Sequence, residues 1–326
     1  DVILSYASIH ENLLEIRQNE IDKTDEEMRH YLKSINAPLD YRTFKSRVDS
    51  LKGQKLKDMY LANRISKNFG DIRIINPENL PDFDFFTYSF PCQDISVAGY
   101  QNGLDANSGT RSSLLWECCK IIEAKKPKYL MMENVKNLVG SNHKKNFETF
   151  LNYLEKLGYK NHWDILNARD YGIPQNRERV FCISILGENN NFCFPNKIPL
   201  KLKMNDLLEK DAPQKFYLSH NQYTEDPIDQ EWIYCLDSNY WKGTFLKDFL
   251  EKHRRQVVSC PKDDRGVYPA RRLTPHETWR FMGVSDDDFY KASTLVSNTS
   301  LYKQSGNSIV VPVLEAIFTN LFKEEN

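Results

Sequence analysis

A cysteine stands directly after a proline at the end of an apolar run, in TYSFPCQDIS at residues 87–96. A thiol attacks carbon as its thiolate, and few thiols are ionised at neutral pH because the unperturbed pKa is about 8.5. Pro91 fixes φ and keeps Phe90 extended, which directs Cys92 out of the preceding strand into a polar loop. Free cysteines are more often small buried residues. A role for Cys92 as a nucleophile therefore depends on what the rest of the chain brings to it.

Three other stretches carry polar side chains that could act with this thiol. Glu133 follows an apolar strand, and a partly buried carboxyl there can hold or donate a proton. Arg177 and Arg179 alternate along the extended segment QNRER and so point the same way, either as surface charge before a strand or as two guanidiniums at the site. The residues GNS at 306–308 precede a helix, where they are often only an N-cap.

The segments that must position these residues alternate between strands and helices. Residues 83–90 are rich in aromatics and stop at Pro91, which is typical of a buried strand. Apolar residues recur at helical spacing in residues 112–127 and 144–159, and Gly158 stands where a helix C-cap favours glycine. The pattern predicts further strands at residues 128–135, 162–168 and 179–186.

Such alternation indicates an α/β fold with a Rossmann-like, mostly parallel sheet and helices on both faces. In these sheets ligands bind beyond the carboxyl ends of the strands, which is where both Cys92 and Glu133 fall.

The chain divides into three stretches on the same grounds. The α/β rhythm covers residues 1–189, with a charged and mostly helical pattern over 11–68, and it fails over 190–270, which we interpret as a smaller irregular domain. Residues 271–326 return to the first domain, because Thr274 begins a capping box and the apolar face at 310–322 should pack on the sheet.

Composition limits the class of protein. The 326 residues are 40% hydrophobic and 27% charged, with a net charge of −1, which is typical of a globular protein without a uniformly basic surface. No apolar run is long enough for a membrane span, and the first residues do not resemble a signal peptide, so we expect a cytoplasmic protein. The seven cysteines have neither disulfide-framework nor zinc-ligand spacing, and we predict no metal site.

Five motifs in order, SFPCQ, ENV, QNRER, RRLTPHE and GNS, resemble the DNA (cytosine-5) methyltransferase family, in particular its bacterial and phage branch. The resemblance runs from about residue 70 to 318. It implies a class I methyltransferase fold, S-adenosyl-L-methionine as the cofactor and double-stranded DNA as the partner, in a restriction–modification or phage self-protection system. It also implies that residues 190–270 are the target-recognition domain.

The resemblance assigns roles to individual residues. Cys92 matches the nucleophile, Glu133 the glutamate that holds cytosine at N3 and N4, Arg179 the arginine at cytosine O2, and Arg177 the neighbour that orders the glutamate. The residues that match the cofactor pocket are Asp71, Ile72, Pro91, Leu114, Asn307 and Ser308. The residues we assign to DNA contacts are Gln93, Ser96, Arg111, Tyr240, Lys242, Arg254 and Arg255.

The chemistry of the base explains why these residue types are needed together. Addition of a thiolate to C6 of cytosine makes C5 nucleophilic enough to take a methyl group, and a proton near N3 stabilises the adduct. The base must leave the duplex to expose C6, which costs a few kcal/mol of unstacking. The glycines between residues 92 and 112 suit a loop that closes over a flipped base.

The match departs from the family at the start of the chain. The glycine-rich first strand and turn, and the acidic residue that holds the cofactor ribose, are absent, so the sequence is expected to begin about 30 to 50 residues late, from the size of a βαβ unit. A missing N-terminal segment or a second polypeptide would complete the cofactor site. We otherwise expect a monomer on DNA, associated with the bacterial nucleoid.

Two other functions remain open at the sequence level. One is an RNA (cytosine-5) methyltransferase of the tRNA-directed kind on the same scaffold, and the other is a catalytically silent DNA-binding relic. The size of the region 190–270 favours a reader of DNA, and the retention of Cys92, Glu133 and Arg179 together speaks against decay.

Overall fold

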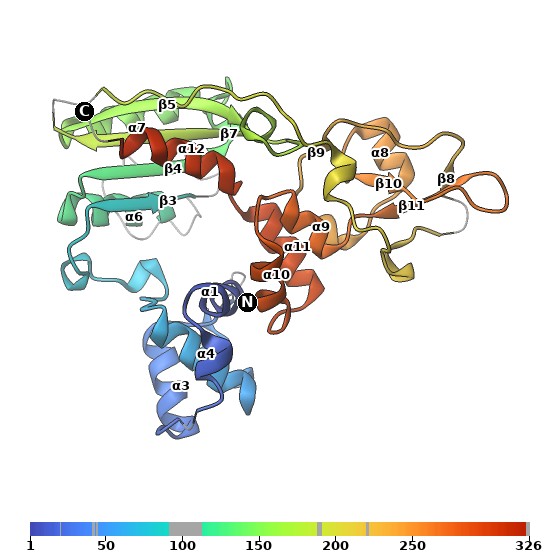
Figure 1. The fold of residues 1–326 in the computed structure, drawn as a ribbon. Coiled ribbons are helices and arrows are strands. Elements are labelled where there is room, and N and C mark those ends of the chain that lie inside the picture. The colour runs from blue at the N-terminus through green and yellow to red at the C-terminus, as the bar shows by residue number, and fades with distance from the viewer. Residues whose placement is uncertain are drawn as a thin grey trace.

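The computed structural model describes residues 1–19, 21–40, 43, 45–90, 113–187, 191–219 and 222–323. A four-stranded sheet forms the centre, in the order β3 (Phe85–Tyr88), β4 (Tyr129–Val135), β7 (Glu178–Leu186) and β5 (Tyr159–Asn167) (Figure 1). β3 and β4 are parallel, and β7 is antiparallel to both of its neighbours. Three of the four strands therefore share one direction.

The reversed strand follows from its connection. Residues 168–177, between β5 and β7, hold only the short elements η6 (Ala168–Tyr171) and β6 (Gln175–Asn176). Parallel neighbours need a crossover of a dozen or more residues, usually a helix, so a link this short makes β7 pair with β5 in the antiparallel sense.

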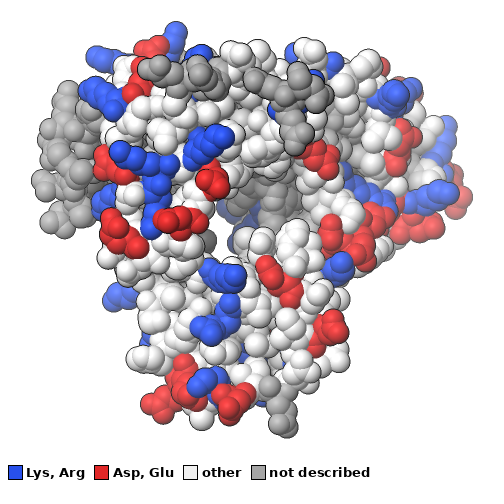
Figure 2. Space-filling view, turned by 60° about the vertical axis from the view of Figure 1, so that its left-hand side comes forward, with Lys and Arg blue, Asp and Glu red and all other residues white. Residues whose placement is uncertain are grey.

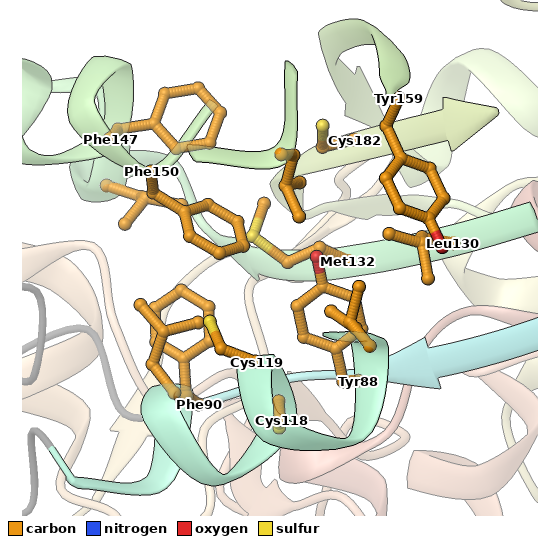
Figure 3. Packing of buried hydrophobic residues seen from close by; sticks show 14 of the residues in the cluster. Tyr88, Phe90, Cys118, Cys119, Leu130, Met132, Phe147, Phe150, Tyr159 and Cys182 are labelled. Atoms are coloured by element: carbon orange, nitrogen blue, oxygen red, sulfur yellow. The ribbon is translucent and has the colours of Figure 1, made fainter. Parts of the chain in front are cut away.

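Helices cover both faces of this sheet, as the alternation of strands and helices predicts. On one face α6 (Ser113–Lys125) and α7 (Lys144–Lys156) bury a cluster that includes Cys119 and Phe150 against Tyr88 and Met132 (Figure 3). On the other face α12 (Val311–Leu321) packs against side chains of β4 and β7. Successive strand residues point to opposite faces, which is why Met132 belongs to the first core and Met131 to the second.

The N-terminal part is helical, in agreement with the sequence pattern. It contains α1 (Val2–His10), α2 (Leu13–Ile16), α3 (Asp25–Ser34) and α4 (Gln54–Ile65), with a two-stranded ribbon of β1 (Leu39–Asp40) and β2 (Lys45–Ser46). Thr24 and Glu27 form a capping box at the start of α3. Ser8 of α1 donates a hydrogen bond of 2.8 Å to the Lys291 carbonyl, so the two ends of the chain are in contact.

Residues 204–219 and 222–272 form a lobe beside the sheet (Figure 1). Residues 192–198, which the predicted domain 190–270 includes, pack instead on the central sheet: Phe192 belongs to the core under α12, and the amide of Ile198 donates 2.9 Å to the Asp170 carbonyl. A three-stranded antiparallel sheet has the order β10 (Val257–Ser259), β11 (Tyr268–Arg272) and β8 (Tyr223–Thr224), next to α8 (Leu246–Lys252). β9 (Ile233–Tyr234) leaves the lobe and pairs with β6 beside the central sheet.

The chain then returns through three helices to α12. These are α9 (Pro275–Arg280), α10 (Asp286–Ser293) and α11 (Asn298–Asn307). The predicted capping box of Thr274 and Glu277 is present, and Arg271 makes a buried ion pair of 2.7 Å with Glu277. The remaining 3₁₀ turns are η1 (Val48–Ser50), η2 (Ile72–Ile74), η3 (Pro77–Asn79), η5 (Lys136–Val139), η7 (Met204–Leu207), η8 (Gln214–Phe216) and η9 (Tyr240–Lys242).

Nowhere in the described parts of the chain does a helix have both the length and the apolar character that crossing a membrane requires.

Candidate active site

Glu133 lies near the carboxyl end of β4 and is 8% exposed. Its carboxylate Oε1 is 3.2 Å from Nε of Arg179, which the antiparallel register places two pairs away, opposite Val135. Burial raises the pKa of the Glu133 carboxyl, and the charges of Arg179 and Arg177 and a hydrogen bond from Ser89 only partly oppose this. The site therefore holds a carboxyl that keeps its proton more readily than a free glutamate does.

Arg179 is fixed by more than the glutamate. Its Nη1 donates 2.8 Å to the Glu178 carbonyl, and its Nη2 lies 3.7 Å from the sulfur of Cys235. Nη1 of Arg177 lies 3.6 Å from the same sulfur. The two arginines thus point the same way, as their spacing predicts, and one thiol from the region 190–270 touches both.

Arg177 is expected to order Glu133, but its hydrogen bonds go to backbone carbonyls instead. It is 3% exposed, and its Nη atoms donate to the carbonyls of Leu236 (2.9 Å), Gly306 (3.1 Å) and Ser308 (2.7 Å). Burial lowers the pKa of its guanidinium, and the nearby charge of Arg179 adds to this effect. Arg177 acts on Glu133 as a neighbouring positive charge, which opposes the rise in the pKa of that carboxyl.

The end of β3 lies beside the end of β4 that carries Glu133. β3 and β4 are in parallel register with Tyr88 opposite Met132, so the residues that follow each strand leave the sheet side by side. Asn134, 4% exposed, donates 2.8 Å from Nδ2 to the Phe90 carbonyl. The chain therefore enters its next segment at the edge of the sheet that holds Glu133.

That next segment carries several predicted site residues that lie outside the described residues. These are Pro91, Cys92, Gln93, Ser96 and Arg111.

The predicted cofactor residues come from three elements. Asp71 caps η2, is 7% exposed, and accepts hydrogen bonds from Arg73 and, at 2.8 Å, from Nδ2 of Asn36. Burial opposes its ionisation, but these hydrogen bonds outweigh burial and lower the pKa of Asp71. Ile72 packs against the core under α6, whose first turn carries the half-buried Leu114.

Asn307 and Ser308 end one helix rather than begin the next. Asn307 is the exposed last residue of α11, and Ser308 is its C-cap, with Oγ donating 2.7 Å to the Gln304 carbonyl. The N-cap of α12 is Val310. The alternative that residues 306–308 are only an N-cap of the following helix therefore does not hold.

The predicted DNA contacts in the lobe separate into buried and exposed residues. Tyr240 is 1% exposed, and its hydroxyl donates 2.5 Å to the Gln256 carbonyl, so the prediction that it contacts DNA is wrong. Lys242 and Arg254 are exposed, whereas Arg255 donates 2.7 Å from Nη1 to the Gly243 carbonyl.

Basic and acidic side chains are interspersed on the face shown in Figure 2, in keeping with the net charge of −1. The face is hollowed near its centre, where basic side chains lie inside the hollow. An exposed lysine or arginine can serve as a phosphate contact without a uniformly basic surface.

Two residues of the site gave no separate signal in the sequence. Asn134 follows Glu133 in the ENV motif, and a polar side chain after an apolar strand is the one feature of the sequence that could have indicated its role. Cys235 lies in the irregular region, and no local pattern connects it to Arg177 or Arg179.

Comparisons with known proteins agree with this arrangement. Residues 24–323 match the family model described as C-5 cytosine-specific DNA methylase. The chain is 74% identical over 325 residues to Type II methyltransferase M2.ScrFI of Lactococcus lactis subsp. cremoris, covering 100% of this chain and 90% of that protein. It is 31% identical to Type II methyltransferase M.HhaI of Haemophilus parahaemolyticus, covering 81% and 84% of the two chains.

The fold is also similar to solved structures. The crystal structure of S. pombe Dnmt2 methyltransferase matches with a TM-score of 0.59 and 18% identity, over 80% of this chain and 86% of that one. At this identity the likeness concerns the fold alone, and it agrees with an α/β sheet covered by helices on both faces.

Proposed function

The chain belongs to the C-5 cytosine-specific DNA methylase family, and from this we propose that it flips a target cytosine out of duplex DNA and methylates C5 with S-adenosylmethionine as the donor. One observation carries the proposal. A buried carboxyl with a raised pKa, Glu133, lies 3.2 Å from Arg179 at the sheet edge where the segment bearing Cys92 departs.

We assign the steps on the base to these residues. The Cys92 thiolate adds to C6 of the flipped cytosine, and the ring electrons move toward N3. Glu133 supplies the proton at N3, which suits a carboxyl whose burial favours the protonated form. Arg179 donates to the base O2. After C5 is methylated, a base removes the C5 proton, the thiolate leaves C6, and N3 returns its proton to Glu133, so both Cys92 and Glu133 are regenerated.

The described residues fit a binding site for the methyl donor. S-adenosylmethionine supplies an electrophilic methyl group on a sulfonium. Asp71 would hold the amine of its adenine by exchanging one of the hydrogen bonds that its carboxylate accepts from Arg73 and Asn36, which together occupy its acceptor positions. Ile72 and Leu114 offer apolar surface beside it. Asn307 exposes an amide at the end of α11.

The division of labour between lobes is also a proposal. We assign residues 1–189 and 271–326 to the catalytic domain and 190–270 to target recognition. The lobe has its own antiparallel sheet and exposes Lys242 and Arg254. Because the relatives are Type II methyltransferases, we place the enzyme in a restriction–modification system, acting on the DNA of its own cell in the cytoplasm.

Trapping the covalent adduct tests the proposal. Fluorine at C5 cannot leave as a proton, so duplexes containing 5-fluorocytosine should form a denaturant-stable complex with the full-length protein and S-adenosylmethionine. Cys92→Ala should abolish both this complex and methyl transfer. Cys193→Ala, which changes an exposed cysteine, is the matched control and should leave both intact. A complex that persists in Cys92→Ala would assign the nucleophile elsewhere.

A further inference from the structure

Arg177 joins three parts of the chain that are far apart in sequence. The residue lies just before β7, yet its guanidinium binds the carbonyl of Leu236 in the recognition lobe and those of Gly306 and Ser308 at the end of α11. It is 3% exposed, so these bonds are shielded from water. The planar fork of an arginine can satisfy several carbonyls at once, which a lysine ammonium cannot do with the same geometry.

The lobe segment reaches this position through the neighbouring strand pair. β6 and β9 are parallel, with Gln175 opposite Ile233. Leu236 donates 3.1 Å from its amide to Oε1 of Gln175, whose Nε2 donates 2.7 Å to the Phe281 carbonyl. Gln175 is fully buried. The backbone at 233–236 is thus fixed to the catalytic domain by hydrogen bonds rather than by apolar packing alone.

The backbone that follows Leu236 packs against Gly306 of α11. A Cβ at position 306 would lie 2.3 Å from both the Asp237 carbonyl carbon and the Ser238 nitrogen, closer than non-bonded atoms approach. The peptide between Asp237 and Ser238 therefore rests directly on the last turn of α11. Residues 235–238, which we call the docking segment, lie between Arg177 and Gly306.

The docking segment also touches the base pocket. The sulfur of Cys235 lies 3.6 Å from Arg177 and 3.7 Å from Arg179, and Arg179 is the partner of Glu133. A shift of this segment would therefore move the recognition lobe and the contacts of Arg179 together.

We propose that Arg177 is a positioning residue rather than a catalytic one. Together with Gly306 it fixes the docking segment and so sets where the recognition lobe presents DNA to the pocket of Glu133 and Arg179. This inference rests on the proposed function, since it assumes that the lobe binds DNA and that the pocket receives the base.

Steady-state kinetics of Arg177→Lys in the full-length protein test this role. A single ammonium cannot reproduce the three carbonyl contacts, so the KM for duplex DNA should rise at least tenfold. The kcat at saturating DNA should stay within about threefold, because Arg179 loses only the contact with the Cys235 sulfur and keeps its ion pair with Glu133 and its bond to the Glu178 carbonyl. The pH profile of kcat should not move, and sequencing of methylated sites should show more methylation at near-cognate sequences.

A matched control separates this effect from a loss of stability. Arg29 donates 2.8 Å to the Val48 carbonyl and 2.6 Å to the Leu51 carbonyl, so it holds backbone by the same chemistry within the N-terminal helices. Arg29→Lys should lower the melting temperature without changing the KM for DNA or the choice of site.

The opposite kinetic pattern would overturn the proposal. A hundredfold loss of kcat in Arg177→Lys, with unchanged KM and a shifted pH profile, would mean that Arg177 acts on Glu133 or on the base.

If Arg177→Lys fails to fold, Cys235→Ala decides, because it removes the side-chain contact of the docking segment and leaves the backbone bonds. It should raise the KM for DNA two- to fivefold, and an unchanged KM and site choice would refute the inference. Loss of adduct trapping in the wild-type protein would instead count against the proposed function.

Discussion

Replacing Glu133 by glutamine should separate stability from catalysis. Glutamine has the shape of the protonated carboxyl but cannot give up or take a proton. At 3.2 Å and an effective dielectric constant of about 20, the attraction between ionised Glu133 and Arg179 is about 5 kcal/mol. The raised pKa of Glu133 shows that the loss of hydration on burial outweighs this attraction, so the ionised carboxyl is a net destabilising group in the fold.

The direction of the pH dependence follows from the same shift. A carboxyl whose pKa is higher in the folded than in the unfolded chain adds stability below its unfolded value, and that contribution is lost as the pH rises through the folded value. A difference of one unit between the folded and unfolded pKa corresponds to about 1.4 kcal/mol in the free energy of unfolding. At pH 8 the free energy of unfolding of Glu133→Gln should therefore equal or exceed that of the wild type, and the difference should shrink as the pH falls toward 5.

Catalysis should change in the opposite sense. Positioned proton donors contribute about 10²- to 10⁴-fold to a rate, so the single-turnover rate of methyl transfer should fall by that factor in Glu133→Gln. The Kd for duplex DNA should change by less than about threefold, because Glu133 acts on the base after it has left the helix. Denaturant melts at pH 5 to 8, filter binding and single-turnover assays measure these three quantities.

Two results would refute this reasoning. Removing one partner of a buried ion pair that is net stabilising typically costs about 3 to 5 kcal/mol. A loss of that size in Glu133→Gln at pH 8, without recovery at low pH, would show that Glu133 is held as a stabilising carboxylate. Equal losses of DNA affinity and rate would show that its role is in binding.

Other predictions concern the recognition lobe and the return to the catalytic domain. Exchanging residues 190–270 for those of a relative should move methylation to another sequence while methyl transfer persists, and an unchanged target in bisulfite sequencing would place recognition elsewhere. Arg254→Ala should weaken binding of all duplexes and flatten the salt dependence if this exposed side chain contacts phosphate, or relax one position by about 1 to 3 kcal/mol if it reads a base. Arg255→Ala should instead lower the melting temperature, because this arginine holds the Gly243 carbonyl, and an unchanged melting temperature would contradict that role. Arg271→Met should cost about 3 to 5 kcal/mol in chemical denaturation, because it leaves a fully buried carboxylate unpaired, and a loss below 1 kcal/mol would contradict this.

The sequence by itself determined the features that depend on local pattern. The helical faces of residues 112–127 and 144–159, the capping box of Thr274 and the packing of the last helix on the sheet are all as expected. Local spacing suffices for these because side-chain direction repeats with the period of a helix or strand, and a cap involves residues only three apart. The order of five short motifs was likewise enough to indicate the family.

Tertiary structure decided everything that depends on which distant segments meet. The role of Arg177 rests on acceptors up to 131 positions away in the chain, and no local spacing encodes such a contact. Tyr240 carries the residue type expected of a DNA contact, but burial in the lobe assigns it to the core. Residues 306–308 have the composition of an N-cap, yet they end α11, where Gly306 leaves room for the peptide of Asp237. A residue type limits what a side chain can do, but its partners are set by packing over the whole fold.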